Sequence, residues 1–90
     1  MKFAVSWNPA AEKDLADLWL NHPQLQREIA DASNRIDSQL RVAPDNAGES
    51  RVGTVRIMVV DPLLVEFNVV AEDLRVNVVA VSLWQRRPNS

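Results

Sequence analysis

The 90-residue sequence has no cysteine and no tyrosine, only two glycines and one histidine. The absence of cysteine excludes disulfides, thiolate zinc sites and a cysteine nucleophile, and it favours a reducing compartment such as the cytoplasm. No apolar run approaches the roughly 20 residues that a membrane-spanning helix needs, and Asn8-Pro9 ends the first apolar segment too early for a signal-peptide core. We therefore expect a soluble cytoplasmic protein without a membrane partner.

Basic residues are not in excess. Lys and Arg number 10 against 12 Asp and Glu, which gives a formal net charge of −2. The chain thus lacks the positive surplus that drives binding to phosphate backbones. All but two of the basic residues are arginine, whose planar fork suits carboxylate or phosphate, so a few placed arginines can still bind an anion. The length predicts a single domain over residues 1–90.

The first half of the sequence predicts one strand and two helices. Residues 3–7 alternate apolar and small or polar side chains, as a half-buried strand does. Asn8-Pro9 is a helix start, because Asn accepts from a free N–H and Pro suits the first helical position; this helix runs to about residue 21. His22-Pro23 interrupts the pattern, and apolar residues at steps of three and four predict a second helix over 25–42.

The second half predicts a three-stranded meander over 54–60, 63–70 and 74–83, after a loop over 43–53. We choose a three-residue turn at 61–63 because it places the apolar faces of the first two strands together. A two-residue turn at Glu72-Asp73 does the same for the second and third. The expected pairs are Ile57 with Phe67, Val59 with Val65, Val69 with Val76 and Phe67 with Val78.

The predicted fold class is α+β with the order β-α-α-β-β-β, an antiparallel sheet carrying a helical hairpin on one face. The other face of the sheet is then open to solvent or to a partner. The pairings place Arg56, Asn68 and Asn77 in one row across this open face. The face is expected to carry further polar and apolar residues: Glu66, Arg75, Met58, Val70, Val79 and Val81.

Several single residues allow both a structural and a functional interpretation. His22 is expected to face solvent or cap a helix, and Trp7 and Trp19 to pack in or beside the core, because each tryptophan lies on its element's apolar stripe. For Trp84 both a packing role and a binding role stay open, since it ends the last strand beside two arginines. We find no glycine-rich phosphate loop, no metal-ligand spacing and no Ser-His pair, so neither a cofactor nor a metal is expected.

The densest polar feature outside the helices is Gly48–Arg51, with Arg56 five residues later. It is either a solvated loop with a salt bridge or a site for an anion or an acidic peptide. In the second interpretation Arg51 and Arg56 act with Arg86 and Arg87 from the end of the last strand.

The order of these elements, together with a set of residues along the chain, resembles the RelE/ParE toxin superfamily of the plasmid stabilisation type. The resemblance covers nearly the whole chain, and no single motif in it is highly specific. It is carried by Val5–Ala11 with Leu15, Ile36–Leu40 with Pro44, Gly48–Arg51, Arg56, Pro62-Leu63 and Val76–Val81.

This resemblance implies the toxin of a bacterial type II toxin-antitoxin pair. RelE-like members cleave messenger RNA in the ribosomal A site, ParE-like members inhibit DNA gyrase, and an antitoxin segment wraps and neutralises either kind. Arg51 and Arg56 match the arginines that usually open the second strand, and Arg86 or Arg87 matches the basic residue after the last strand.

The chain differs from RelE-type nucleases because it lacks their usual terminal His or Tyr. Cleavage by attack of a 2′-hydroxyl needs a base, for which Glu49 and Glu66 are the candidates, with an arginine as electrostatic stabiliser. Trp84 offers a stacking surface, and Asn68 and Asn77 offer substrate contacts.

A ribosome-dependent endoribonuclease ranks just above a gyrase inhibitor, and a non-catalytic interaction module of the same fold is the alternative. The antitoxin is expected to lay apolar anchors over Met58, Val70 and Val79, with acidic groups at Arg56.

Overall fold

The computed structural model describes residues 2–42, 49–52 and 55–84, and for 49–52 it describes the backbone alone. Within these residues no helix is long and apolar enough to cross a membrane. The elements in chain order are β1 (Ala4–Trp7), α1 (Pro9–Asn21), the 3₁₀ turn η1 (Pro23–Leu25), α2 (Gln26–Val42), β2 (Glu49–Val52), β3 (Val55–Val60), β4 (Leu63–Val70), the 3₁₀ turn η3 (Ala71–Asp73) and β5 (Arg75–Leu83).

The helical hairpin begins and turns where the sequence predicts. The Asn8 side chain accepts a hydrogen bond from the Ala11 N–H at 2.9 Å, and Pro9 is the first helical residue. At the corner, Nδ1 of His22 lies 3.0 Å from the Leu18 carbonyl oxygen, so the imidazole caps the last turn of α1. The expected capping role of His22 is confirmed.

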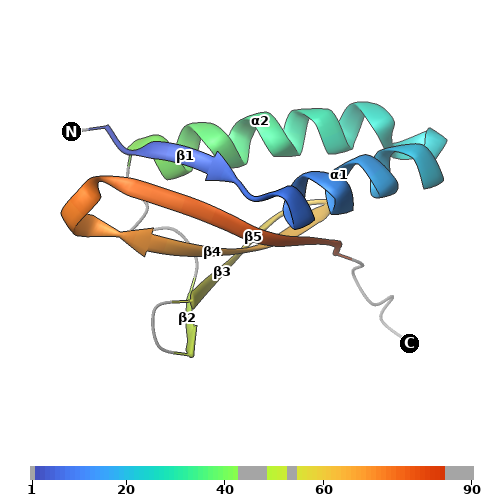
Figure 1. Cartoon of the computed structure of the whole chain (residues 1–90). Helices are drawn as coiled ribbons and strands as arrows, with labels where there is room; N and C mark the ends of the chain where they lie inside the picture. Colours follow the sequence, from blue (N-terminus) through green and yellow to red (C-terminus); the bar gives the residue numbers. More distant parts are fainter. Residues whose placement is uncertain (1, 43–48, 53–54, 85–90) are drawn as a thin grey trace.

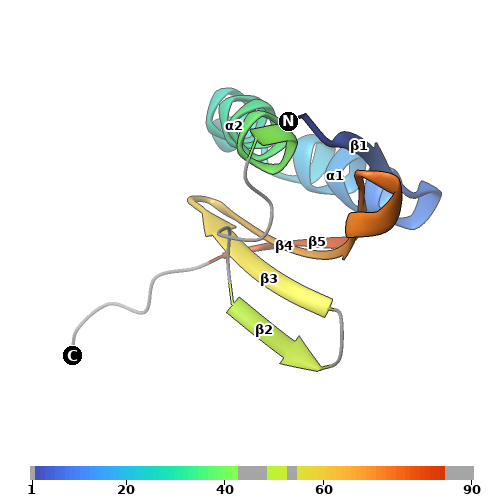
Figure 2. The same ribbon diagram turned by 90° about the vertical axis from the view of Figure 1, so that its left-hand side faces the viewer.

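The sheet has the strand order β1-β5-β4-β3-β2. Figures 1 and 2 show α1 and α2 on one side of it, with β2 and β3 extending away from the helices. The α+β class and the hairpin on one face are therefore confirmed. The sheet is mixed rather than purely antiparallel, since β1 pairs parallel to β5 and the other neighbours are antiparallel. The helical hairpin supplies the long crossover that a parallel pair requires.

One strand lies where a loop was predicted. Residues 43–53 show no apolar alternation, yet Glu49–Val52 form β2 and pair with β3. The backbone hydrogen bonds of an edge strand depend on its neighbour rather than on its side chains, which explains why the pattern gave no signal. The rest of that predicted loop, 43–48 and 53, lies outside the described residues.

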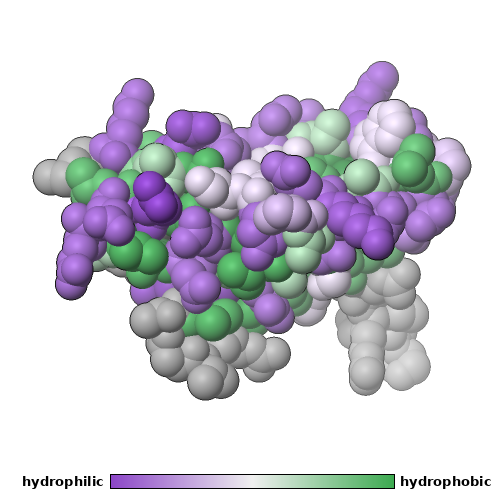
Figure 3. All heavy atoms as spheres, in the orientation of Figure 1, coloured by the Kyte–Doolittle hydropathy of each residue, from purple (hydrophilic) through white to green (hydrophobic). Residues whose placement is uncertain are grey.

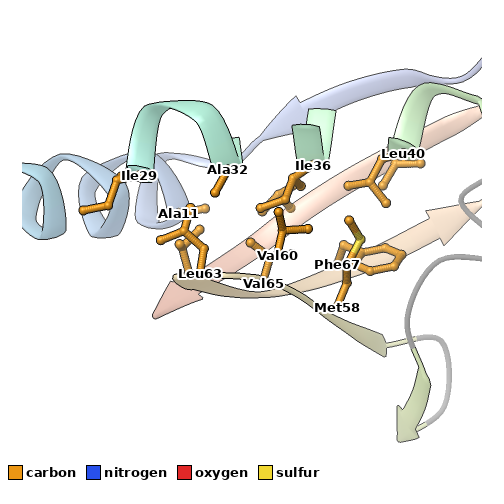
Figure 4. Close-up of a cluster of buried hydrophobic side chains, with 13 residues drawn as sticks. Ala11, Ile29, Ala32, Ile36, Leu40, Met58, Val60, Leu63, Val65 and Phe67 are labelled. Atoms are coloured by element: carbon orange, nitrogen blue, oxygen red, sulfur yellow. The ribbon is translucent and has the colours of Figure 1, made fainter. Parts of the chain in front are cut away.

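The core lies between the hairpin and the sheet. Figure 4 shows Ile36 and Leu40 of α2 above Met58 of β3 and Phe67 of β4. The side chains of Ile36, Leu40 and Phe67 are fully buried. The other members of the cluster come from both helices and three strands: Ala11, Ile29, Ala32, Val60, Leu63, Val65, Val76, Val78 and Val81.

The β3–β4 turn differs from the prediction. Val60 pairs with Leu63, so the turn has two residues, Asp61 and Pro62, and the expected three-residue turn is wrong. Residues of β3 are therefore shifted by one position against β4, and Met58 faces the core instead of the solvent. Both faces of β3 are rich in apolar side chains, so the hydrophobic pattern could not distinguish the two registers.

The β4–β5 pairing is predicted correctly over its first half. Val69 pairs with Val76 and Phe67 with Val78, as expected. Beyond this point Glu66 pairs with Ala80, so Val79 is an extra residue in a β-bulge.

The bulge shifts the alternation of β5. It places Val81 in the core, only 5% exposed, and corrects its expected position on the open face.

Candidate functional site: the outer sheet face and the helix groove

The side of the sheet turned away from the helices is called the outer face below. Its residues follow from the strand registers, because side chains alternate along each strand. Many of them are half-buried by their neighbours, and Val59 is 42% exposed. The outer face comprises Val55, Ile57 and Val59 of β3, Leu64, Glu66, Asn68 and Val70 of β4, and Arg75, Asn77, Ala80 and Ser82 of β5.

Three predicted site residues come together on the outer face. Asn68 and Asn77 are direct cross-strand partners, as expected, and Glu66 is the next outward residue along β4. Cross-strand partners have Cβ atoms about 5 Å apart, and outward residues on one strand are roughly 7 Å apart. One carboxylate and two carboxamides therefore form a compact polar group.

Trp84 lies at the end of the outer face. Its N–H donates to the Pro62 carbonyl oxygen at 2.7 Å, which extends the β4–β5 ladder by one residue. By the alternation of the strand, Trp84 follows Ser82 on the outer side. Trp84 is 41% exposed, so an indole surface is accessible at the end of the sheet where Val59 pairs with Leu64.

Arg56 does not belong to this group. It pairs with Phe67, whereas Val55 pairs with Asn68, so the predicted row of Arg56, Asn68 and Asn77 is wrong. The two-residue turn places Arg56 on the same side of β3 as Met58. Its Nε is buried and has no hydrogen-bond partner within the described part of the chain. A buried guanidinium donor without an acceptor is energetically costly.

Four other predicted site residues are described in part or not at all. Glu49 and Arg51 lie on the edge strand β2, where the register places Glu49 beside Ile57. Arg86 and Arg87 lie outside the described residues.

A groove between the two helices is a feature that the sequence prediction missed. It has a volume of about 650 Å³ and lies between the 12–20 face of α1 and the 30–37 face of α2. Trp19, predicted to pack in or beside the core, lines this groove and is 42% exposed, and Leu20 is 65% exposed. Two adjacent large apolar residues after Leu18 widen the apolar stripe of α1, which is the signal that could have indicated a second surface.

The charged residues that line the groove, Glu12 and Asp37, are both acidic, and Asp37 accepts a 2.6 Å hydrogen bond from Arg41 Nε. Trp7 also reaches the groove while packing against the core, so its expected packing role is confirmed.

Figure 3 shows the side of the molecule seen in Figure 1, where hydrophilic residues surround smaller hydrophobic areas.

The outer face can form hydrogen bonds, stack on a flat ligand and accept a proton. Carboxamides both donate and accept, the indole stacks, and Glu66 can take a proton. Arg75 brings a cation to the far end of the face. Among the described residues no cluster of three or more His, Asp or Glu can hold a metal ion.

Comparison with known proteins identifies the architecture. No family model matches the sequence, and no curated protein matches it. Among solved structures, a chain of the chromosomal ParDE toxin-antitoxin system from P. aeruginosa superimposes with a TM-score of 0.76 at 17% identity, over 93% of this chain and 98% of that one. The RelBE2 toxin-antitoxin complex from Mycobacterium tuberculosis gives 0.76 at 16% identity, over 92% of each chain.

The isolated E. coli RelE toxin gives a TM-score of 0.66 at 14% identity, over 94% of this chain and 87% of that one. These similarities cover the hairpin and the sheet together. The chain therefore has the fold of small toxins of toxin-antitoxin pairs. Within that class it is the RelE/ParE fold, as the resemblance in the sequence implied.

Proposed function

We propose that residues 1–90 form one domain that acts as the toxin of a type II toxin-antitoxin pair. The observation that supports this most directly is the near-complete overlap with the ParDE and RelBE2 chains, at a TM-score of 0.76 in both cases. The outer face supports it further, because the helices leave one side of the sheet available to a target.

Expression in a bacterial host tests this proposal. Induction of the wild-type chain should stop growth, and co-expression of the product of a neighbouring small gene should restore it. A chain that leaves growth unchanged at a verified level of folded protein is instead a non-catalytic interaction module of the same fold.

Endoribonuclease activity is the finer proposal for the outer face. Glu66 takes the proton of a 2′-hydroxyl as its oxygen attacks the adjacent phosphorus; the bond to the 5′-oxygen breaks, a 2′,3′-cyclic phosphate forms, and water protonates the departing 5′-oxygen. Asn68 and Asn77 hold the phosphate, and Trp84 stacks on a base. An arginine stabilises the charge that develops on the phosphate, for which Arg51, Arg86 and Arg87 are the candidates. Arg56, a candidate from the sequence, lies on the opposite side of β3. General-base catalysis contributes typically 10²–10⁴-fold, so the loss of Glu66 should be easy to measure.

A gyrase inhibitor uses the same face without a proton transfer. Apolar Ile57, Val59 and Leu64 lie beside the amides there, a composition typical of a protein interface. Glu66→Gln separates the two activities, because it removes the base while keeping the shape. Loss of mRNA cleavage on programmed ribosomes supports the nuclease, whereas unchanged arrest together with inhibited supercoiling supports the gyrase inhibitor. Arg56→Ala and Arg51→Ala test the arginine assignments in the same two assays.

We propose that the cognate antitoxin docks in the helix groove. Of the three sheet-face anchors expected from the sequence, Met58 cannot serve, because it is only 5% exposed. The groove instead runs along residues 12–20 of α1, about two turns or roughly 12 Å, which fits the anchor spacing of an amphipathic helix. Trp19 and Leu20 are exposed at one end of it. Glu12 favours a partner with Lys or Arg beside its apolar stripe, whereas Asp37 already pairs with Arg41.

Binding of the growth-restoring protein, measured by calorimetry, tests this docking mode. Trp19→Ala should weaken the complex by at least about 30-fold, as an aromatic anchor does. Val42→Ala is the matched control, because Val42 is 66% exposed near the end of α2 and does not line the groove. Equal affinities for the two variants would exclude the groove and leave the toxin proposal intact.

A further inference from the structure

Strand β1 ends before the edge of β5 does. The last β1–β5 pair is Trp7 with Val78, and the Asn8 N–H donates to the Val78 carbonyl oxygen at 3.0 Å. Beyond this bond the chain enters α1, so among the described residues no strand pairs with the remaining edge of β5. Main-chain N–H groups along a sheet edge that packs against a helix need another acceptor.

Asp14 of α1 supplies that acceptor. Its Oδ2 accepts a hydrogen bond from the Val81 N–H at 3.2 Å, across 67 residues of sequence. Asp14 is partly buried, and an ionised acceptor makes a stronger bond than a neutral carbonyl does. Its neighbours in sequence Lys13 and Leu15 have other roles: Lys13 is exposed and Leu15 packs against the core.

The bond falls just after the β-bulge, where the direction of the strand's side chains is set. If β5 had no bulge and Val79 were an ordinary residue of the ladder, strict alternation from the inward Val78 would turn Ser82 and Trp84 toward the helices. With the bulge, Val81 is buried and Trp84 is directed to the outer face. The Val81 amide can meet Asp14 only in the bulged register, because the N–H groups of a strand alternate between its two edges.

We infer that Asp14 is a positioning residue for the outer face. By holding the Val81 amide it stabilises the bulge at Val79 and so presents Trp84 to the target. This inference rests on the proposed function, in which Trp84 contacts the target. Asp14 lies on a helix on the opposite side of the sheet and acts only through β5.

Nuclear magnetic resonance tests the structural part of this inference independently of toxicity. Asp14→Ala should speed hydrogen exchange at the Val81 amide about tenfold or more, since a bond to a charged acceptor is lost. It should also shift the fluorine resonance of Trp84 in protein labelled with 5-fluorotryptophan. Asp14→Asn keeps a side-chain oxygen acceptor and should restore both signals, and the exposed Asp17→Ala on the same helix should change neither.

Growth arrest tests the functional part. Asp14→Ala should weaken arrest and Asp14→Asn should recover it. Ile36→Val, a core variant of reduced stability outside the groove, should retain arrest, because it leaves the bond between Asp14 and the Val81 amide in place.

Unchanged hydrogen exchange at the Val81 amide, an unmoved Trp84 resonance, or an equal loss of arrest in an Ile36→Val protein of the same melting temperature as Asp14→Ala would overturn the inference. If the wild-type chain does not arrest growth, the proposed function fails while the resonance measurements still decide whether Asp14 holds the bulge.

Discussion

Replacing Met58 and Val59 one at a time by alanine tests the two-residue turn. The length of this turn determines which residues of β3 face the core and which lie on the outer face. The two residues are adjacent and both apolar, but Met58 is 5% exposed in the core and Val59 is 42% exposed on the outer face. Met58→Ala removes three buried heavy atoms at about 0.8 kcal/mol each and leaves a cavity, so the expected loss of stability is about 2 to 4 kcal/mol. Val59→Ala removes two partly exposed methyl groups and should cost less than about 1 kcal/mol.

Urea unfolding followed by circular dichroism measures both values. A domain of this size has a free energy of unfolding of about 5 to 13 kcal/mol, so both differences lie within the measurable range. If Val59→Ala costs more than Met58→Ala, then β3 has the register of a three-residue turn, Met58 lies outside, and the outer face defined above is incorrect.

Two further predictions concern turns and caps, and each is checked by thermal or urea unfolding. Asn8→Ala removes the acceptor for the Ala11 N–H and should lower the free energy of unfolding by about 1 kcal/mol. Asn8→Ser should recover most of that loss. An unchanged free energy of unfolding in Asn8→Ala would mean that the cap does not stabilise α1. Leu74 has a φ of 50° in the left-handed region after η3, so Leu74→Gly should be more stable than Leu74→Ala, which loses the same half-buried side chain, by about 0.5 to 1 kcal/mol. Glu72→Gly in the same turn should be less stable than Glu72→Ala, and the reverse order in either pair would contradict the described turn.

Much of the helical layer could be predicted because local chemistry determines it. Asn8-Pro9 and His22-Pro23 set the helix boundaries through capping and proline geometry, and the apolar spacing of α2 reports its buried side directly. In β4, inward Val65 and Phe67 alternate with polar outward residues, so its faces were also predictable.

The candidate site was harder to predict because it depends on features that leave no local signal. Both faces of β3 are apolar apart from Arg56, so hydrophobicity fitted either turn length and the wrong choice reversed the side on which Arg56 lies. The bulge at Val79 is stabilised by Asp14, which is distant in sequence. The groove at Trp19 requires the relative placement of two helices, which a single helical stripe does not contain.

Viable counts after induction of two lysine variants test the central claim most directly, that the chain is a toxin acting through its outer face. Val59→Lys places a charge on that face at a position that tolerates polarity, and Val42→Lys does the same on α2 away from it. With folding verified by circular dichroism, Val59→Lys should lose growth arrest while Val42→Lys arrests growth like the wild-type chain. Equal arrest by both variants would contradict the role of the outer face, and an inactive wild-type chain would contradict the toxin function itself.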